Sequence, residues 1–343
     1  QGSVNWCDYA AGGRLVISVS DARSIRVRDT LRGDAWTMLG HTGAINAGAL
    51  SAGGEMFATG SVDGVVREWS PWLGEFANLT GHRRPIKALA VLDDAERVLS
   101  IAADGSARLW DSRSALLLRV LHPSESGAER DPVWAVSPTS AQAATAGAGR
   151  VRLVSLESGA LEQTLESGDS DPLTTLAFSP DGARLAAGSD RGLVYVWELA
   201  GTRAPAVLRG ARGRASRLAW LDDGRTLAVG STWQGASTAV RSARGSEVNV
   251  FDVERRALSR LLGELEGDLF ALERSPEGDD LLLGWRPQGK TATLRRVDVA
   301  KLEPRGADVQ IDAEHAMWFA EGRRIVAAGR DSGVQLVLSL IHI

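Results

Sequence analysis

A recurring segment of about ten residues constrains most strongly how this chain can fold. In PLTTLAFSPDG, alternating apolar residues run into an Asp-Gly turn, and counterparts of this segment occur along the whole chain. The copies begin at Val4, Ile45, Ile86, Val133, Leu173, Ala215, Leu269 and Ala313, so one follows another after roughly 40 to 54 residues. A repeat of this length indicates a fold in which one supersecondary unit is used many times.

Each repeat contains several short apolar runs separated by turns that hold Asp or Gly. After Leu173, for example, the runs RLAAGS and LVYVWE follow the first one. Alternating apolar residues bounded by such turns predict β-strands, and four strands every 40 to 45 residues or so predict an all-β propeller of four-stranded antiparallel blades. We expect eight blades in a single domain, the last three-stranded, with seven blades as the alternative. The expected units cover residues 2–39, 40–80, 81–130, 131–169, 170–209, 210–265, 266–312 and 313–343.

Two repeats carry the same polar residues at matching positions. Each begins with Gly-His, and a hydroxyl residue, an Asp and a Trp follow. The two sets are His41, Thr59, Asp63 and Trp69, and His82, Ser100, Asp104 and Trp110. On these residues the chain resembles the WD-repeat β-propeller family over nearly its whole length. The resemblance implies that each set is a hydrogen-bonded tetrad with a structural role, since a buried imidazole and a buried indole N–H each need a partner.

The remaining repeats depart from the family pattern at its Trp-Asp position. That position reads Arg28-Asp29, Val154-Ser155, Trp197-Glu198, Phe251-Asp252, Val297-Asp298 and Leu338-Ser339. We therefore expect these blades to be held together by packing rather than by the tetrad network.

One stretch matches the phosphate-binding P-loop pattern. GWRPQGKT, residues 284–291, fits G-x-x-x-x-G-K-[ST] and follows an apolar run. A P-loop needs a helix that begins at the Lys, whereas TATLRRVDV alternates as a strand does, and Pro287 removes an amide donor. We interpret the match as coincidental and expect no nucleotide cofactor.

Composition narrows the class of protein further. No apolar run reaches the length of a membrane span, and the net charge of −4 argues against general affinity for nucleic acid. The single cysteine, Cys7, cannot form an internal disulfide, which favours the cytoplasm. Arg greatly outnumbers Lys, a bias that we associate with a bacterial genome.

The sequence offers no catalytic, cofactor or metal site. It lacks G-x-S-x-G, H-E-x-x-H and a Cys pair, and its five histidines are spread over different repeats. We expect a non-enzymatic protein-interaction module, a scaffold or sensor of the kind that bacterial members of the family often provide within larger proteins. Two alternatives stay open, namely a propeller enzyme with carboxylates in its channel and nucleic-acid binding through arginines.

Basic and aromatic residues gather in loops that the resemblance assigns to one face, around blades five to seven. They are Trp233, Arg241, Arg244, Trp285, Arg286, Lys290, Arg209, Arg212 and Arg214. Since Arg and Trp are common interface anchors, we expect this exposed sector to bind a protein or peptide, with an acidic one as its complement. The alternative is a solvated surface whose arginines pair with Glu264, Glu266 and Asp268. Trp134, Lys87 and Phe270 occupy like positions in first strands and are expected at the channel mouth as further candidates for partner contact. The alternative for these three, which we favour, is packing in the core or at the rim.

The two ends of the chain lead to an expectation about ring closure. The last repeat stops after its third strand, GVQLVLSLIHI, and the first begins almost at once at Val4. We expect the chain to be part of a longer polypeptide, with an exposed sheet edge along Gly333–Ile343.

Overall fold

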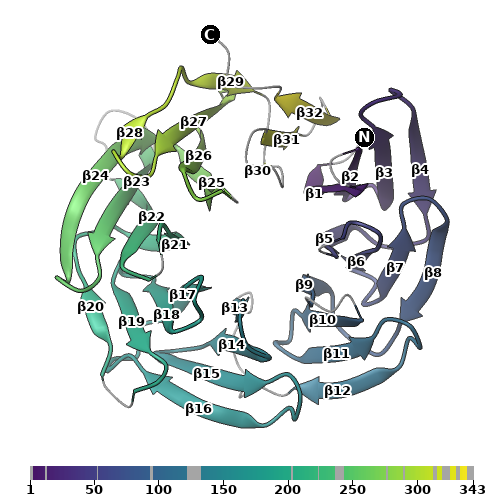
Figure 1. The fold of residues 1–343 in the computed structure, drawn as a ribbon, viewed down its shortest axis with the longest axis horizontal. Helices are drawn as coiled ribbons and strands as arrows, with labels where there is room; N and C mark the ends of the chain where they lie inside the picture. Colours follow the sequence, from purple (N-terminus) through teal and green to yellow (C-terminus); the bar gives the residue numbers. More distant parts are fainter. Residues whose placement is uncertain are drawn as a thin grey trace. The chain divides into compact units, whose positions relative to one another are not determined.

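The chain folds into β-strands joined by turns (Figure 1), here in a computed structural model. The structure describes residues 3–11, 14–51, 53–92, 96–121, 133–201, 204–222, 224–235, 243–275, 277–288, 290–311, 315–318, 325–329 and 333–337. Strand contacts divide the chain into two compact units. Unit one is Gln1–Pro132 with Asp312–His342, and unit two is Val133–Ile311 with Ile343.

Unit one contains three four-stranded antiparallel sheets and one three-stranded sheet. The first is β1 (Val4–Ala10), β2 (Leu15–Ser20), β3 (Ser24–Asp29) and β4 (Ala35–Leu39); the second is β5 (Ile45–Leu50), β6 (Phe57–Ser61), β7 (Val66–Ser70) and β8 (Gly74–Leu79). The third is β9 (Ile86–Val91), β10 (Arg97–Ala102), β11 (Ala107–Asp111) and β12 (Leu117–Leu121). The last is β30 (His315–Trp318), β31 (Ile325–Gly329) and β32 (Gly333–Val337).

Unit two contains four sheets of the same kind. They are β13 (Val133–Val136), β14 (Gln142–Ala146), β15 (Arg150–Ser155) and β16 (Leu161–Glu166); β17 (Leu173–Phe178), β18 (Arg184–Ser189), β19 (Val194–Glu198) and β20 (Ala206–Leu208); and β21 (Arg214–Trp220), β22 (Thr226–Gly235), β23 (Ala243–Asp252) and β24 (Ala257–Glu266). The fourth is β25 (Asp268–Arg274), β26 (Asp280–Arg286), β27 (Ala292–Asp298) and β28 (Glu303–Pro304), and β29 (Val309–Ile311) also pairs with β27.

The predicted four-stranded antiparallel blades are confirmed, and the predicted count of eight is corrected. Seven sheets are complete blades of four strands or more, which matches the alternative count. The last repeat supplies only the three strands β30–β32 within the described residues, so a count of repeats exceeds the number of complete blades. Residues 338–343, which hold Leu338-Ser339 and much of the expected exposed edge, lie outside the described part of the chain.

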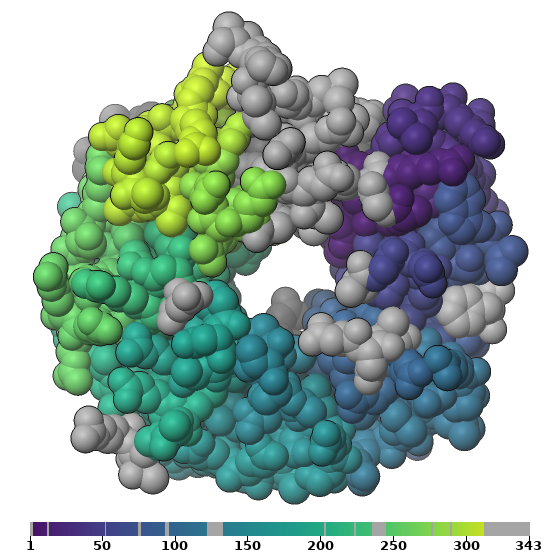
Figure 2. Space-filling model, in the orientation of Figure 1, coloured from purple at the N-terminus to yellow at the C-terminus, as the bar shows by residue number. Residues whose placement is uncertain are grey.

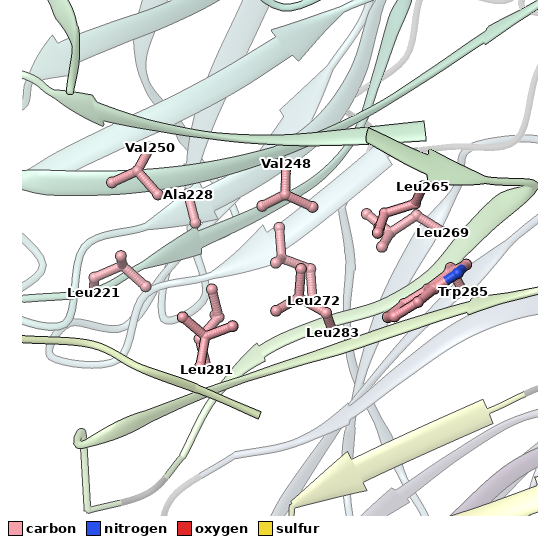
Figure 3. Packing of buried hydrophobic residues seen from close by; sticks show 11 residues of the cluster. Leu221, Ala228, Val248, Val250, Leu265, Leu269, Leu272, Leu281, Leu283 and Trp285 are labelled. Carbon is pink, nitrogen blue, oxygen red and sulfur yellow. The ribbon is translucent and has the colours of Figure 1, made fainter. Parts of the chain in front are cut away.

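Apolar side chains from neighbouring blades pack against one another, and side chains fill the space between strands (Figure 2). Figure 3 shows one such layer in unit two, where Val248 and Val250 of β23 face Leu281 and Leu283 of β26. Trp285 continues the apolar face of β26 and is 7% exposed. Each Val or Leu buried in this way stabilises the fold by about 1.5–3 kcal/mol.

Glycines in the second strands permit this close packing of blades. A Cβ on Gly60 would lie 2.3 Å from Cγ2 of Ile86, and one on Gly230 would lie 2.2 Å from Cδ2 of Leu269. Ile86 and Leu269 belong to the first strand of the following repeat. The absence of a side chain at Gly60 of ATGS and Gly230 of AVGS therefore leaves room for the first strand of the next blade.

Candidate functional site

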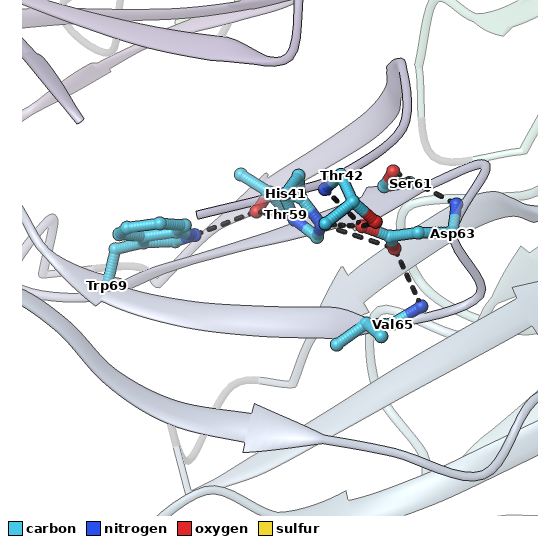
Figure 4. Close-up of polar contacts among 7 residues, drawn as sticks. All are labelled: His41, Thr42, Thr59, Ser61, Asp63, Val65 and Trp69. Carbon is cyan, nitrogen blue, oxygen red and sulfur yellow. Dashed lines mark hydrogen bonds and ion pairs between the residues drawn. The ribbon is translucent and has the colours of Figure 1, made fainter. Parts of the chain in front are cut away.

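The structure brings together the four polar residues of the second repeat (Figure 4). Trp69 Nε1 donates to Thr59 Oγ1 at 2.7 Å, and His41 Nε2 lies 2.8 Å from the same oxygen. His41 Nδ1 lies 3.0 Å from Asp63 Oδ2. Because an indole N–H only donates, the Thr59 hydroxyl accepts from Trp69 and donates to His41 Nε2, which leaves Nδ1–H to donate to Asp63. A single assignment of the protons thus gives each N–H and O–H group of this network a hydrogen-bond acceptor.

Asp63 in this network is held in its ionised form. Burial by itself would raise the pKa of Asp63, but the backbone N–H groups of Val65 and Thr42 and the His41 ring outweigh it and hold the pKa below its ordinary value. The two amides donate at 3.0 and 2.9 Å. A carboxylate with its lone pairs occupied in this way ties a turn to its blade and is poorly suited to proton transfer.

The third repeat forms a related network with one additional member. His82 Nε2 lies 2.8 Å from Ser100 Oγ, to which Trp110 Nε1 donates at 2.7 Å. Ser106 Oγ donates to Asp104 Oδ1 at 2.6 Å and lies 3.4 Å from His82 Nδ1. Sequence reasoning missed Ser106, whose only signal is its place two residues after Asp104. Burial, and then the positive charge of Arg108, lower the pKa of His82 to about 4.

Blades without the tetrad pattern also contain buried polar contacts, in addition to their packed apolar cores. Tyr195 donates its hydroxyl to Asp169 Oδ2 at 2.5 Å, and Trp197 Nε1 donates to the Glu166 carbonyl at 3.3 Å. Buried Glu247 accepts from Asn249 Nδ2 at 2.8 Å and from the Arg212 backbone N–H at 2.6 Å. The family pattern did not predict these contacts because the polar groups stand at other positions of the repeat.

A further buried polar contact joins two strands of the blade that contains the P-loop match. Arg296 on β27 donates to Asp280 on β26, and both side chains are almost fully buried. Arg305 Nη1 lies 3.2 Å from Asp280 Oδ1. A buried carboxylate between two guanidinium groups is a structural ion pair that is costly to break.

The stretch that matches the P-loop connects two antiparallel strands. The predicted alternating strand is confirmed as β27, which pairs with β26 through Trp285 and Thr293. Lys290 Nζ lies 3.3 Å from Glu266 Oε2. Since β27 begins at Ala292, the Lys does not start a helix whose amides could converge on phosphates.

The arginines expected to bind a partner lie on the linker between β20 and β21. Arg209, Arg212 and Arg214 are exposed. Arg212 Nη1 lies 3.2 Å from Glu264 Oε1, and Arg214 Nε lies 3.8 Å from Asp190 Oδ1. One arginine pair of the alternative interpretation is therefore present, Arg212 with Glu264, whereas Glu266 pairs with Lys290.

The aromatic members of this sector are less exposed than expected. Trp285 belongs to the core, and the Arg295 guanidinium lies 5.0 Å over its ring. Trp233 is half-buried, because its ring packs on the backbone of Gly245, where a Cβ would lie 2.4 Å from Cζ2. Arg286 is half-buried. Arg241 and the side chain of Arg244 lie outside the described part of the chain.

The three residues expected at the channel mouth differ in exposure. Lys87 is exposed, whereas Trp134 and Phe270 are half-buried, and their place at a channel stays a prediction. Residues at like positions in other first strands link neighbouring strands instead. Asn5 Nδ2 donates to the Ile45 carbonyl at 2.7 Å, and Asn46 Nδ2 to the Ile86 carbonyl at 3.3 Å. The sequence signal for these links is a polar residue directly after the first residue of each strand.

The described residues form neither a metal site nor a membrane-spanning helix. Among the described residues, no group of three or more His, Cys, Asp or Glu side chains is placed to hold a metal ion. No helix in the described ranges is long and apolar enough to cross a membrane.

Comparison with known proteins agrees with this geometry. The family model "WD domain, G-beta repeat" matches residues 34–70, 75–111 and 159–198. The first two matches contain the two Gly-His networks, and each match joins an outer strand to the three strands that follow. The comparisons support a WD-repeat β-propeller family.

Sequence relatives of this chain come from several organisms. It is 26% identical over 253 residues to Telomerase protein component 1 of Rattus norvegicus, which covers 71% of this chain and 9% of that protein. It is 25% identical over 230 residues to Pre-mRNA-processing factor 19 homolog 2 of Arabidopsis thaliana, covering 66% of this chain and 41% of that protein. The chain thus spans a small part of the first relative and less than half of the second. Both are eukaryotic, so a bacterial origin stays a prediction.

A solved structure shares the fold. The C-terminal WD40 domain of Sif2 superposes with a TM-score of 0.78, and the match covers 99% of this chain and 97% of that one. At 14% sequence identity this likeness shows the fold alone.

Proposed function

We propose that this WD-repeat chain is a non-catalytic module that binds a protein partner, as a scaffold or sensor, through a loop surface of unit two. The observation that carries the proposal is the linker of residues 209–214, which presents three exposed arginines beside half-buried Trp233. A Cβ on Gly213 of this linker would lie 2.8 Å from Cβ of Trp233. Arg beside a large apolar ring is a combination that interfaces favour.

The carboxylates that pair with these arginines leave room for a partner. The side chains of Arg212 and Glu264 are 68% and 55% exposed. An exposed pair of this kind contributes only about 0–1 kcal/mol, so a partner's carboxylate can replace Glu264 at little cost. The proposed partner is therefore a protein or peptide with acidic side chains.

The names of the relatives support a role in assemblies. Telomerase protein component 1 is named as a component, and another relative is the ribosome biogenesis protein WDR12 homolog of Drosophila persimilis, 25% identical over 239 residues. A cytoplasmic location remains part of the proposal and depends on the single cysteine.

Affinity capture with the full chain as bait tests the proposal. The test variant replaces Arg212 and Arg214 by Ser, and the matched control replaces Arg255 and Arg256, two exposed arginines of the turn between β23 and β24. We expect the test variant to lose captured protein, because anchor residues contribute about 1–3 kcal/mol each or more, while the control retains it.

Two results would contradict the proposal. One is equal capture of every protein by the parent, the test variant and the control. The other is binding of single-stranded nucleic acid by the parent with a steep fall in affinity as salt rises, since such a fall indicates phosphate contacts. Thermal melting of both variants within a degree or two of the parent establishes that the fold is intact.

A further inference from the structure

A second basic surface lies in unit one, on the loop that leads from β8 to β9. The loop begins with GHRR at residues 81–84, and both Arg83 and Arg84 are exposed. Arg108, on β11 of the same blade, points back toward this loop, because a Cβ on Gly81 would lie 2.6 Å from its Nη1. We name the surface formed by residues 81–84 and Arg108 the GHRR surface.

Contacts with neighbouring residues hold this loop in place. The carbonyl oxygens of His82 and Arg84 lie 3.1 and 3.4 Å from the position of a Cβ on Gly64, in the turn between β6 and β7. The His82 ring is held by Ser100 at 2.8 Å. Arg83 and Arg84 therefore extend from a loop that is fixed on both sides, which lowers the entropy cost of binding.

The arginines of the GHRR surface have no carboxylate partner within the described ranges. None of the ion pairs found there includes Arg83, Arg84 or Arg108, and Nε of Arg108 is buried without a hydrogen-bond acceptor. Asp63, the carboxylate of the turn that supports the loop, is already occupied by His41, Thr42 and Val65. This distinguishes the surface from the linker of unit two, where Arg212 and Arg214 have Glu264 and Asp190.

Arg108 is a positioned donor for which the described part of the chain offers no ion pair. Its guanidinium carbon lies 6.0 Å over the ring of buried Trp110, so the side chain is held by stacking. After burial, the charge of Arg108 is the largest cause that lowers the pKa of His82. The negative charge of Asp104 acts on this pKa in the opposite direction.

We propose that the GHRR surface binds an acidic peptide segment of a protein partner, whose Asp or Glu carboxylates pair with Arg83, Arg84 and Arg108. The planar guanidinium suits carboxylates because it donates two parallel hydrogen bonds. A peptide fits better than a nucleic acid, since three arginines on a chain of net charge −4 do not form the long basic track that a run of phosphates requires. The inference shares with the proposed function the idea of an acidic protein partner, and it places that partner on other residues.

The test measures binding of a fluorescein-labelled oligoglutamate peptide to the full chain by fluorescence anisotropy at low salt. The test variant is Arg83→Ser with Arg84→Ser, and a charge-conserving variant carries Lys at both positions. The matched control is Arg255→Ser with Arg256→Ser, two exposed arginines that belong to neither proposed surface. Because exposed ion pairs contribute about 0.2–1 kcal/mol each and two are lost, we expect Kd to rise about twofold to thirtyfold in the Ser variant. In the Lys variant and the control we expect Kd to change less than twofold.

Every outcome separates the two proposals. No binding to the parent, an unchanged Kd in the Ser variant, or an equal loss in the control would overturn the acidic-peptide site while leaving capture by unit two untouched. Labelled oligothymidylate bound more tightly than oligoglutamate would overturn it in favour of phosphate recognition. A melting temperature near that of the parent is expected for the Ser variant, since Arg83 and Arg84 are exposed.

Discussion

Replacing Thr59 by Val isolates the hydrogen bonds of the second-repeat network. Thr59 is fully buried on β6, and its hydroxyl accepts from Trp69 Nε1 at 2.7 Å and lies 2.8 Å from His41 Nε2. Valine has almost the same shape as threonine and cannot form either hydrogen bond. The change therefore leaves a buried indole donor and a buried imidazole acceptor without a partner, while packing is conserved.

The expected loss of stability follows from the two groups left without a partner, the Trp69 indole N–H and the His41 ring nitrogen. Trp69 is 1% and His41 6% exposed, so water does not replace the lost partner. An unsatisfied buried polar group costs about 1–3 kcal/mol, so Thr59→Val should lower the free energy of unfolding by about 2–6 kcal/mol. Thr59→Ser keeps the hydroxyl and removes one methyl group, which should cost about 1 kcal/mol. Ser100 performs the same task in the third repeat.

Urea unfolding followed by tryptophan fluorescence compares the parent, Thr59→Val and Thr59→Ser. We expect the Val variant to unfold at clearly lower urea than the Ser variant. Equal midpoints for the two variants would refute the reasoning, because they would show that the hydroxyl adds nothing beyond its volume.

Three further predictions concern other parts of the structure. Trp110→Ala should lower the free energy of unfolding by about 3–5 kcal/mol, since it empties a buried site and leaves Ser100 without its donor; a melting point within two degrees of the parent would contradict this. Lys290→Ala should leave the melting point unchanged, and calorimetry with ATP and Mg²⁺ should show no binding to the parent. The pKa of His82 is lowered from 6.5 to about 4, so the folded protein favours the neutral ring. The contribution of His82 to stability is therefore full above pH 6.5 and is lost as the pH falls toward 4. In the His82→Gln variant, the urea midpoint should change less between pH 6.5 and pH 4 than it does in the parent. An equal change with pH in both proteins would disprove the assignment.

The sequence predicted much of the fold because its signals are local. Alternating runs and turns identified strands, and the Trp-Asp position and its substitutes stand at the ends of third strands, as Asp29 ends β3 and Asp298 ends β27. The number of complete blades was harder to predict, since a repeat that begins like the others need not supply four strands.

The surface was predicted less well because exposure depends on contacts distant in sequence. Trp285 was expected at the surface, but alternation along β26 turns it into the same apolar layer as Leu281 and Leu283. The hydrogen bond from the Arg212 backbone to Glu247 joins the segment between β20 and β21 to β23, and no local sequence pattern predicts it. Likewise, that no ion pair within the described ranges includes Arg83 or Arg84 follows from the folded structure and from no local sequence pattern.

Hydrogen exchange of the full chain, alone and with a captured partner, tests most directly whether the linker of unit two binds protein. Backbone amides in the linker 209–214 are expected to exchange more slowly in the complex, because a bound partner excludes water from an exposed loop. Amides at Arg255 and Arg256 should exchange at the same rate in both states. Unchanged exchange across 209–214 in a saturated complex would contradict the account.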